Sequence, residues 1–313
     1  MAAPLFEFAT TAMSTVVSVQ IVGEHPNAAA LAAESLDWFR LVEASCSRFD
    51  PASELVRLCH VAPGLAHVSP LLFEVLRVAL AVANASDGAF DPTLGSALHA
   101  HGFDRHWVTQ SRAPTMAPIT TGQWRDMVLD EAELSVRLPN ATSLDLGGIA
   151  KGFALDLAAR ALAGVADCCL VAGGDVLCRG LNADGRPWCT AVLDPFHPQQ
   201  AAGTVTVEAP EYAVCTSGDY ARRTANGHHL LDARQLVEPH HGVPSTTRMR
   251  SATVVAPQAA IADALATAAF VMGPQTAAVL LKEQMVDALL IDAEGTMHTV
   301  AGWGRANFVP CHP

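Results

Sequence analysis

The sequence predicts an α+β fold: a single domain over residues 1–313 in which flanking helices cover a mixed, largely antiparallel sheet core. Segments with helical periodicity lie towards both ends of the chain, and alternating runs rich in β-branched residues lie in the middle. We find no internal repeat, low-complexity linker or other sign of a domain boundary. With 50% hydrophobic and 16% charged residues, a chain of this length can bury a large core.

Composition excludes several classes of partner. The net charge is −12 and no sustained basic run occurs, which argues against nucleic acid and anionic membrane surfaces. No apolar run is long enough to span a membrane. The start of the chain has neither a basic nor an apolar leader segment, so we expect a cytoplasmic protein, or an exported one if a leader was removed. Eight cysteines without a CxxC pair indicate reduced, buried thiols.

The N-terminal half begins with a β-branched alternation that predicts a strand over 15–22. A long amphipathic helix then opens at Pro26-Asn27 and runs to about Cys46. Ser53 is suited to capping a short helix. The remaining predicted elements of this half are a helix over 70–85, an irregular segment over 89–95, a loop region over 100–125 and a hairpin over 128–138.

The C-terminal half contains a glycine turn that leads into a helix from Phe153. Asn226-Gly227 is a strong hairpin signal, so we expect His229 and Asp232 on or just after the returning strand. The other predicted elements are strands over 168–171, 188–193, 204–208, 252–255, 288–291 and 297–300, and helices over 261–272 and 275–282.

The glycine turn is the first candidate for chemistry. Gly147 and Gly148 let the backbone approach a ligand closely, and the helix that follows offers unpaired N–H groups to an anion. Lys151 would add a full positive charge there. Taken alone, the pattern fits a plain turn equally well.

A second candidate lies on the helix over 261–272. Asp263 and Thr267 are four residues apart, so their oxygens share one side of an otherwise apolar helix. A carboxylate, a hydroxyl and a backbone carbonyl form the hard oxygen set that Mg²⁺ prefers. Alternatively, Asp263 caps the helix and Thr267 bonds back to the preceding turn.

The histidines offer weaker signals. His229 and Asp232 fit a general base with its orienting acid, but also a half-buried structural histidine. A second group of histidines has no cysteine nearby and no recognised ligand spacing, so we predict no transition-metal site there; its members are His99, His101, His240 and His241.

Five segments carry more information together than separately. In chain order they are Asp145-Leu146-Gly147-Gly148-Ile149-Ala150-Lys151-Gly152, Gly173-Gly174-Asp175, Thr216-Ser217-Gly218-Asp219-Tyr220, His229-Leu230-Leu231-Asp232 and Asp263-Ala264-Leu265-Ala266-Thr267. Three upstream segments extend the pattern: Met13-Ser14-Thr15, Ser47-Arg48-Phe49 with Ser53-Glu54-Leu55, and Ala89-Phe90-Asp91-Pro92-Thr93. The ordered set covers nearly the whole chain and resembles the FAD:protein FMN transferases of the ApbE type.

This resemblance implies an enzyme that binds FAD, uses Mg²⁺ on its pyrophosphate and moves the FMN part to a Thr or Ser hydroxyl of an acceptor protein, releasing AMP. Matching positions imply that Asp263, Thr267 and the Gly148 carbonyl bind the metal. The implied FAD-lining residues are Met13, Phe49, Ala89, Phe90, Asp91, Asp145, Lys151 and His229. Asp263 and His229 would be catalytic, with His229 as our choice for the group that removes the hydroxyl proton.

The sequence departs from the family's pattern in three places. Ser14 stands where the family usually has glycine, and Phe49 stands where tyrosine is common. The usual Asp-Pro-x-Thr-Gly after the histidine is replaced by Asp232-Ala233-Arg234-Gln235-Leu236. Because a proline and a glycine are lost, we expect a changed loop conformation over residues 233–245.

Two other functions are compatible with these residues. A Mg²⁺-dependent FAD pyrophosphatase would use the same metal site, with water in place of the protein hydroxyl, and would release FMN and AMP. A non-catalytic flavin-binding protein would have less need for the paired oxygens of Asp263 and Thr267.

Overall fold

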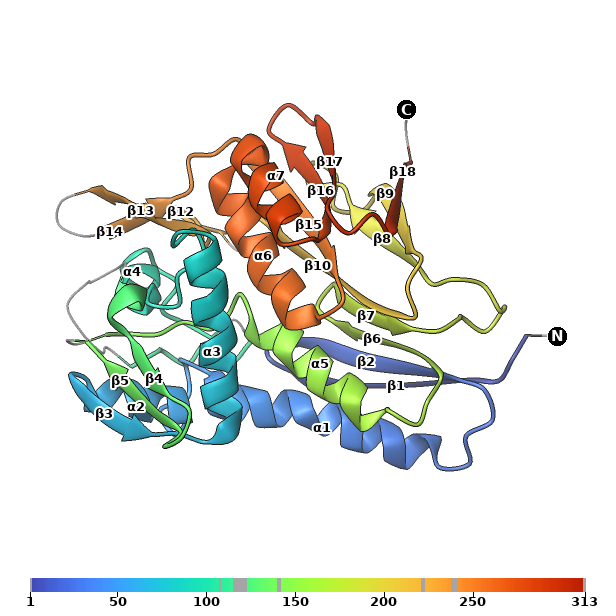
Figure 1. Cartoon of the computed structure of the whole chain (residues 1–313), viewed down its shortest axis with the longest axis horizontal. Helices are drawn as coiled ribbons and strands as arrows, with labels where there is room; N and C mark the ends of the chain where they lie inside the picture. The colour runs from blue at the N-terminus through green and yellow to red at the C-terminus, as the bar shows by residue number, and fades with distance from the viewer. Residues whose placement is uncertain are drawn as a thin grey trace.

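The computed structural model describes residues 2–106, 108–114, 123–139, 142–220, 223–237 and 241–311. Its main sheet has the strand order β1-β2-β6-β7-β10-β15-β16-β17, and every neighbouring pair is antiparallel (Figure 1). The strands are β1 Leu5–Ala12, β2 Thr15–Val22, β6 Asp167–Ala172, β7 Asp175–Arg179, β10 Glu211–Gly218, β15 Met249–Ala256, β16 Asp287–Asp292 and β17 Met297–Ala301. The predicted α+β class is confirmed, but strands from both ends of the chain form the sheet edges.

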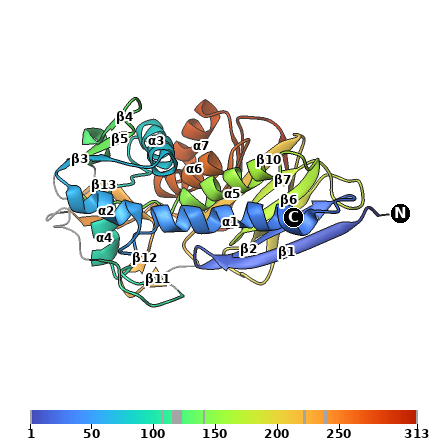
Figure 2. The same cartoon turned by 90° about the horizontal axis from the view of Figure 1, so that it is seen from below.

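Helices cover one face of this sheet. Figures 1 and 2 show α1, α5 and α6 lying across it, and they contact β1 and β2, β6 and β7, and β10 and β15 respectively. The helices of this layer are α1 Ala28–Cys46, α5 Ala150–Ala161, α6 Ala259–Met272 and α7 Pro274–Glu283. Because α6 is built almost entirely from Ala, Leu, Ile, Val and Phe, it can be buried nearly all round, against α5 as well as the sheet.

A small sheet with the order β18-β9-β8 lies on the opposite face. Its strands are β8 Cys189–Leu193, β9 Ala201–Val207 and β18 Ala306–Pro310. Val205 and Val207 pack into a second core cluster together with residues of the main sheet such as Tyr212 and Val255. Successive side chains of a strand point to opposite faces of the sheet, so the main strands contribute side chains to two different cores.

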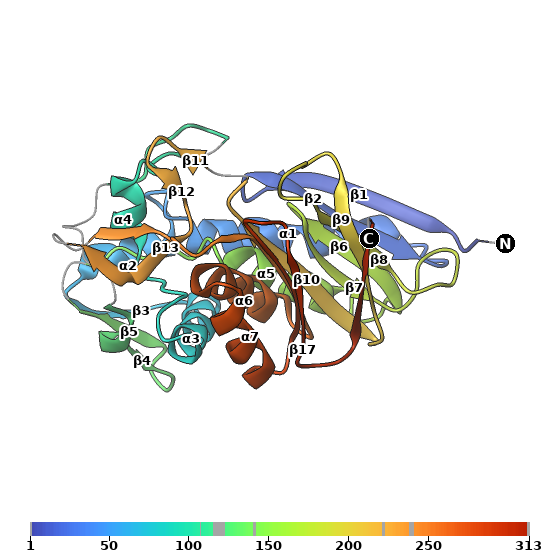
Figure 3. The same cartoon turned by 90° about the horizontal axis from the view of Figure 1, so that it is seen from above.

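The other end of the molecule, opposite the N-terminus, holds the remaining helices and strands (Figure 3). They are α2 Glu54–Val61, β3 Gly64–His67, α3 Pro70–Ala85, α4 Gly95–Ala100, the short 3₁₀ helix η1 Gln123–Asp126, β4 Val128–Asp130, β5 Ser135–Leu138, β11 Arg223–Thr224, β12 Gly227–His228, β13 Leu231–Val237 and β14 His241–Pro244. Ser53 caps α2 as predicted, since its side chain accepts a hydrogen bond from the Val56 N–H.

Most predicted elements are confirmed, including β2 and α3 with their exact bounds. The hairpin near Asn226 exists, but Thr224 pairs with Gly227, so the turn residues are Ala225 and Asn226 rather than Asn226 and Gly227. His229 follows β12 directly, whereas Asp232 lies on β13.

The altered segment after Asp232 forms a hairpin of β13 and β14. Alanine at position 233 keeps the backbone N–H that proline lacks, so a strand can run through this position. Residue 107 and residues 115–122 of the predicted loop, and also residues 238–240 with His240 among them, lie outside the described residues.

All eight cysteines are free thiols. Six are buried as predicted, but Cys189 and Cys311 are exposed because they lie on or beside strands of the small sheet. Cys169 and Cys178 face each other across β6 and β7, with 3.1 Å between their sulfur atoms. Within the described part of the chain, we find no helix with the length and apolarity needed to cross a membrane.

Candidate active site

The glycine turn over 145–152 leads directly into α5, which begins at Ala150 rather than at Phe153. Gly152 lies on α5 where the helix touches the start of α6: a Cβ at this position would lie 2.2 Å from the carbonyl oxygen of Ala259. Gly148 faces the other end of the same contact, since a Cβ there would lie 2.9 Å from the hydroxyl oxygen of Thr267. Both glycines therefore permit a close approach between α5 and α6.

Lys151, Asp175 and Asp263 form a buried charge cluster, which we call the lysine–aspartate cluster. The ammonium group of Lys151 lies 2.5 Å from Asp175 Oδ2 and 3.5 Å from both carboxylate oxygens of Asp263. The Asp175 and Asp263 side chains are only 4% and 5% exposed, and that of Lys151 is 23% exposed. Two carboxylates thus share one ammonium group away from bulk water.

Backbone donors complete the cluster. Asp263 Oδ2 accepts a hydrogen bond from the Gly152 N–H at 3.1 Å, so the carboxylate binds the start of α5 and does not cap its own helix. Asp175 follows the Gly173-Gly174 turn between β6 and β7 and accepts a hydrogen bond from the Thr216 N–H at 3.0 Å. The cluster therefore connects α5, α6 and two neighbouring strands of the sheet.

Burial and the neighbouring charges together set the pKa values of Asp263 and Lys151 in the cluster. It raises the pKa of Asp263 to about 6, although the Lys151 charge acts in the opposite direction. Burial alone would lower the pKa of Lys151, but the charges of Asp175 and Asp263 outweigh it and hold that pKa above its ordinary range. Lys151 is therefore a permanent cation at neutral pH.

The donor set fits a divalent cation. Lys151 balances only one of the two carboxylates, and a buried uncompensated charge is costly, so a further cation would stabilise the cluster. Thr267 Oγ1 lies beside Gly148 and 3.0 Å from Ser217 Oγ. Asp263 lies four residues before Thr267 on α6, so the three residues that the sequence predicts for Mg²⁺ lie in one region of the molecule.

The segment over 89–91 lies next to this donor set. A Cβ on Gly148 would lie 3.4 Å from the ring of Phe90. Ala89, Phe90 and Asp91 are all buried. Asp91 Oδ1 accepts hydrogen bonds from the N–H and the hydroxyl of Thr93, at 2.7 and 2.6 Å, which fixes the predicted turn.

Three loop segments meet around Arg48, whose side chain is 11% exposed. Its guanidinium group forms an ion pair with Asp145 and donates a hydrogen bond to the Phe103 carbonyl. The same group lies over the Phe49 ring, 4.3 Å from the ring centroid. Arg48 therefore links two predicted FAD-lining residues, Phe49 and Asp145.

Met13 lies in the two-residue turn between β1 and β2 and packs against the main core. His229 is half-buried, and its ring makes an edge contact with Phe103 at a centroid distance of 6.0 Å. Phe103 therefore connects the His229 side of the site with Arg48. We call Met13, Arg48, Phe49, Phe103 and Asp145 the loop frame.

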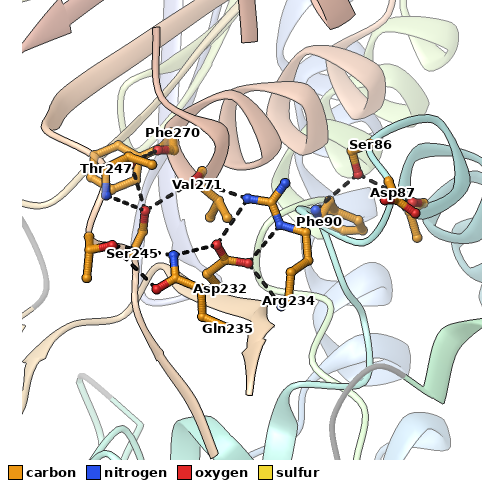
Figure 4. A network of polar contacts seen from close by, with 12 residues as sticks. Ser86, Asp87, Phe90, Asp232, Arg234, Gln235, Ser245, Thr247, Phe270 and Val271 are labelled. Atoms are coloured by element: carbon orange, nitrogen blue, oxygen red, sulfur yellow. Dashed lines mark hydrogen bonds and ion pairs between the residues drawn. The ribbon is translucent and has the colours of Figure 1, made fainter. Parts of the chain in front are cut away.

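Asp232 has other partners than the sequence suggests. Figure 4 shows its buried carboxylate between Arg234 and Gln235. Arg234 Nε and Nη2 donate at 2.8 and 3.0 Å, and Gln235 Nε2 donates at 3.0 Å. These contacts lower the pKa of Asp232 despite its burial. The carboxylate thus anchors β13 through its neighbours Arg234 and Gln235.

Sequence reasoning assigned no role to Asp175, Ser217 or Arg48, although all three lie in the quoted motifs. The acid directly after Gly173-Gly174 was the available signal for Asp175. No sequence signal indicated a role for Arg48, because its partners Phe103 and Asp145 lie far along the chain and in segments without periodicity.

Known proteins match this chain over most of its length. A sequence profile of the ApbE family matches residues 13–290. A protein of Klebsiella pneumoniae (strain 342) named FAD:protein FMN transferase is 27% identical over 296 residues, which are 90% of this chain and 83% of that protein. A protein of the same name from Treponema pallidum (strain Nichols) is 34% identical over 255 residues, or 74% of this chain and 68% of the relative.

Solved structures share the fold. The crystal structure of the ApbE protein from Thermotoga maritima superposes with a TM-score of 0.82 at 28% identity, covering 96% of this chain and 98% of that one. The flavin transferase ApbE from Vibrio cholerae superposes with a TM-score of 0.80 at 24% identity, covering 96% of this chain and 99% of that one.

Proposed function

The chain belongs to the ApbE family, and from this premise we propose that it is a Mg²⁺-dependent enzyme that transfers the FMN part of FAD to a Thr or Ser hydroxyl of an acceptor protein. One observation carries the proposal beyond family membership. Gly148 and Gly152 of the glycine turn lie more than 100 positions from α6 in the chain, yet Gly148 lies beside Thr267 and the Gly152 N–H donates to the buried carboxylate of Asp263.

Asp263, Thr267 and the Gly148 carbonyl would hold Mg²⁺, which when bound neutralises phosphate charge and polarises the attacked phosphorus. Lys151, whose side chain is partly exposed, would hold phosphate oxygens with its ammonium group, while Asp175 fixes its position. Met13, Phe49, Asp91 and the other predicted lining residues would hold the rest of FAD.

In the proposed reaction, the acceptor hydroxyl oxygen forms a bond to the FMN phosphorus, and the bond from that phosphorus to the bridging oxygen breaks. The bridging oxygen leaves with AMP. The hydroxyl proton passes to a base, for which His229 is our candidate because neutral imidazole accepts a proton near neutral pH. The free thiols are consistent with the cytoplasm, where we propose that the enzyme acts.

The direct test is to incubate the protein with FAD, Mg²⁺ and a domain that carries a flavinylation Thr, and to record the mass of the acceptor together with released AMP. We expect the acceptor to gain the mass of one FMN unit and AMP to appear only when the acceptor is present. AMP release without an acceptor would identify a pyrophosphatase. FAD binding without AMP release under either condition would identify a passive flavin-binding protein.

A further inference from the structure

The turn between β1 and β2 has an unusual backbone for the residues it contains. Met13 and Ser14 have φ angles of 52° and 63°, and they connect the paired residues Ala12 and Thr15. Two-residue hairpin turns of this kind favour glycine or asparagine, because a Cβ is disfavoured at positive φ. Glycine at position 14 would be free of this backbone strain, but Ser14 is not. We therefore expect a contact of the Ser14 side chain that compensates for the strain.

The Ser14 hydroxyl supplies such a contact. Its Oγ lies 2.7 Å from Nε2 of His106, 92 positions away in the chain. The Thr109 N–H donates to His106 Nδ1 at 3.0 Å, and a backbone N–H can only donate. Nδ1 therefore carries no proton, and in the neutral imidazole Nε2–H is the donor to Ser14.

The same imidazole ring also contacts the loop frame. His106 meets Phe49 edge to face, with 5.6 Å between ring centroids, and its side chain is 14% exposed. One side chain thus holds two segments, the Met13 turn through Ser14 and the Phe49 loop through its ring. Met13 and Phe49 are both predicted to line the FAD site.

We propose that Ser14 and His106 form a latch of two positioning residues that fixes the Met13 turn relative to the Phe49 ring and so preshapes the FAD site. This inference rests on the proposed function, because it takes Met13 and Phe49 as FAD-lining residues. A preshaped site binds more tightly because less conformational freedom is lost when the ligand enters.

The first experiment measures the dissociation constant of FAD for the full chain by isothermal titration. Ser14→Ala and His106→Leu should each weaken binding about fivefold, the loss expected for one neutral hydrogen bond that helps to order the site. Ser14→Gly removes the hydroxyl as well but also removes the strain at positive φ. It should melt at the wild-type temperature or above, yet bind FAD about as weakly as Ser14→Ala.

A rescue and a double variant separate the latch from general damage. His106→Gln places an amide donor near the former Nε2 position and should recover most of the lost affinity. The double variant Ser14→Ala with His106→Leu should bind about as well as either single variant, since both remove the same hydrogen bond. The matched control is His298→Leu on β17, at the sheet edge opposite β1, which should bind FAD like wild type.

Wild-type affinity in both Ser14→Gly and His106→Leu would overturn the latch while leaving the proposed function intact. Losses that add up in the double variant would also overturn it, because the two residues would then act independently. A wild-type protein that binds no FAD would instead overturn the proposed function, and the latch with it.

Discussion

The lysine–aspartate cluster and the loop frame hold their residues by different means. In the cluster, two helices and two strands fix Lys151, Asp175 and Asp263, and each carboxylate also accepts a backbone hydrogen bond. In the frame, irregular segments are joined by side chains, chiefly Arg48 and the latch histidine His106. The cluster is therefore part of the folding core, whereas the frame shapes a site on top of a core that exists without it.

This difference predicts that cluster variants change stability or the metal-dependent step, whereas frame variants change FAD affinity at nearly constant stability. The largest effect is expected for Lys151→Ala. It leaves Asp175 and Asp263 as buried, unpaired carboxylates, so the free energy of unfolding should fall by about 3–5 kcal/mol in a urea titration. Lys282→Ala, at the exposed second lysine of the chain, is the control and should change little.

Asp263→Asn should give the second largest effect. The substitution keeps the shape of the side chain but removes the charge, so Mg²⁺-dependent AMP release should fall by at least about 100-fold. The melting temperature should stay close to wild type because Asp175 still balances Lys151. Asp292→Asn, which removes a carboxylate beside His298 at the far edge of the sheet, should keep full activity. Full metal-dependent activity in Asp263→Asn would remove this residue from the metal site.

Thr267→Val should have a smaller effect on the same step. Valine keeps the volume and deletes a neutral oxygen that water can partly replace. We expect AMP release to slow by about tenfold, with a raised Mg²⁺ requirement in a metal titration. A loss equal to that of Asp263→Asn would contradict this ranking of the two oxygens.

Arg48→Lys tests the frame. Lysine keeps the charge, but it cannot contact Asp145, the Phe103 carbonyl and the Phe49 ring at the same time with one planar group. We expect FAD to bind about fivefold more weakly with little change in melting temperature. If the variant instead had a much lower melting temperature and bound FAD normally, the distinction between the lysine–aspartate cluster and the loop frame would be wrong.

Asp156 gives the smallest predicted effect, which depends on pH. Its carboxylate on α5 accepts hydrogen bonds from the N–H groups of Ala259 and Ala260 at the start of α6, at 2.8 and 3.0 Å. Burial raises its pKa from 3.8 to about 6. A group with a raised pKa in the folded state contributes stability at low pH that is lost as pH rises through the folded pKa.

The stability of wild type relative to Asp156→Asn should therefore decrease between pH 4 and pH 7. Thermal melts of both proteins across this range would measure the trend. A constant or increasing difference would show that the two backbone donors outweigh burial and keep the carboxylate ionised.

The sequence predicted the cluster better than the frame for a physical reason. Asp263 and Thr267 lie on a periodic helix, so a spacing of four residues was enough to place them on one side of it. A changed backbone after Asp232 was expected because this chain lacks the family's proline, which restricts the backbone, and its glycine, which frees it. That it forms a hairpin depends on pairing with residues 241–244, which no local pattern reveals.

The contacts that hold the loop frame in place could not be predicted in this way. Ser14 and His106 are 92 positions apart, and the segment around His106 has neither helical nor strand periodicity. The same limit explains why no role was predicted for Arg48, although it belongs to the Ser47-Arg48-Phe49 segment of the family pattern. Contacts between loops follow from the packing of the whole molecule rather than from the pattern of one segment.

A crystal structure of the full chain with FAD and Mn²⁺, which substitutes for Mg²⁺ and scatters anomalously, tests the central claim most directly. We predict an anomalous peak bonded to Asp263 and Thr267 oxygens, with the FAD pyrophosphate beside Lys151 and the dinucleotide in contact with Met13 and Phe49. A metal bound elsewhere, or FAD bound away from the lysine–aspartate cluster, would contradict the account.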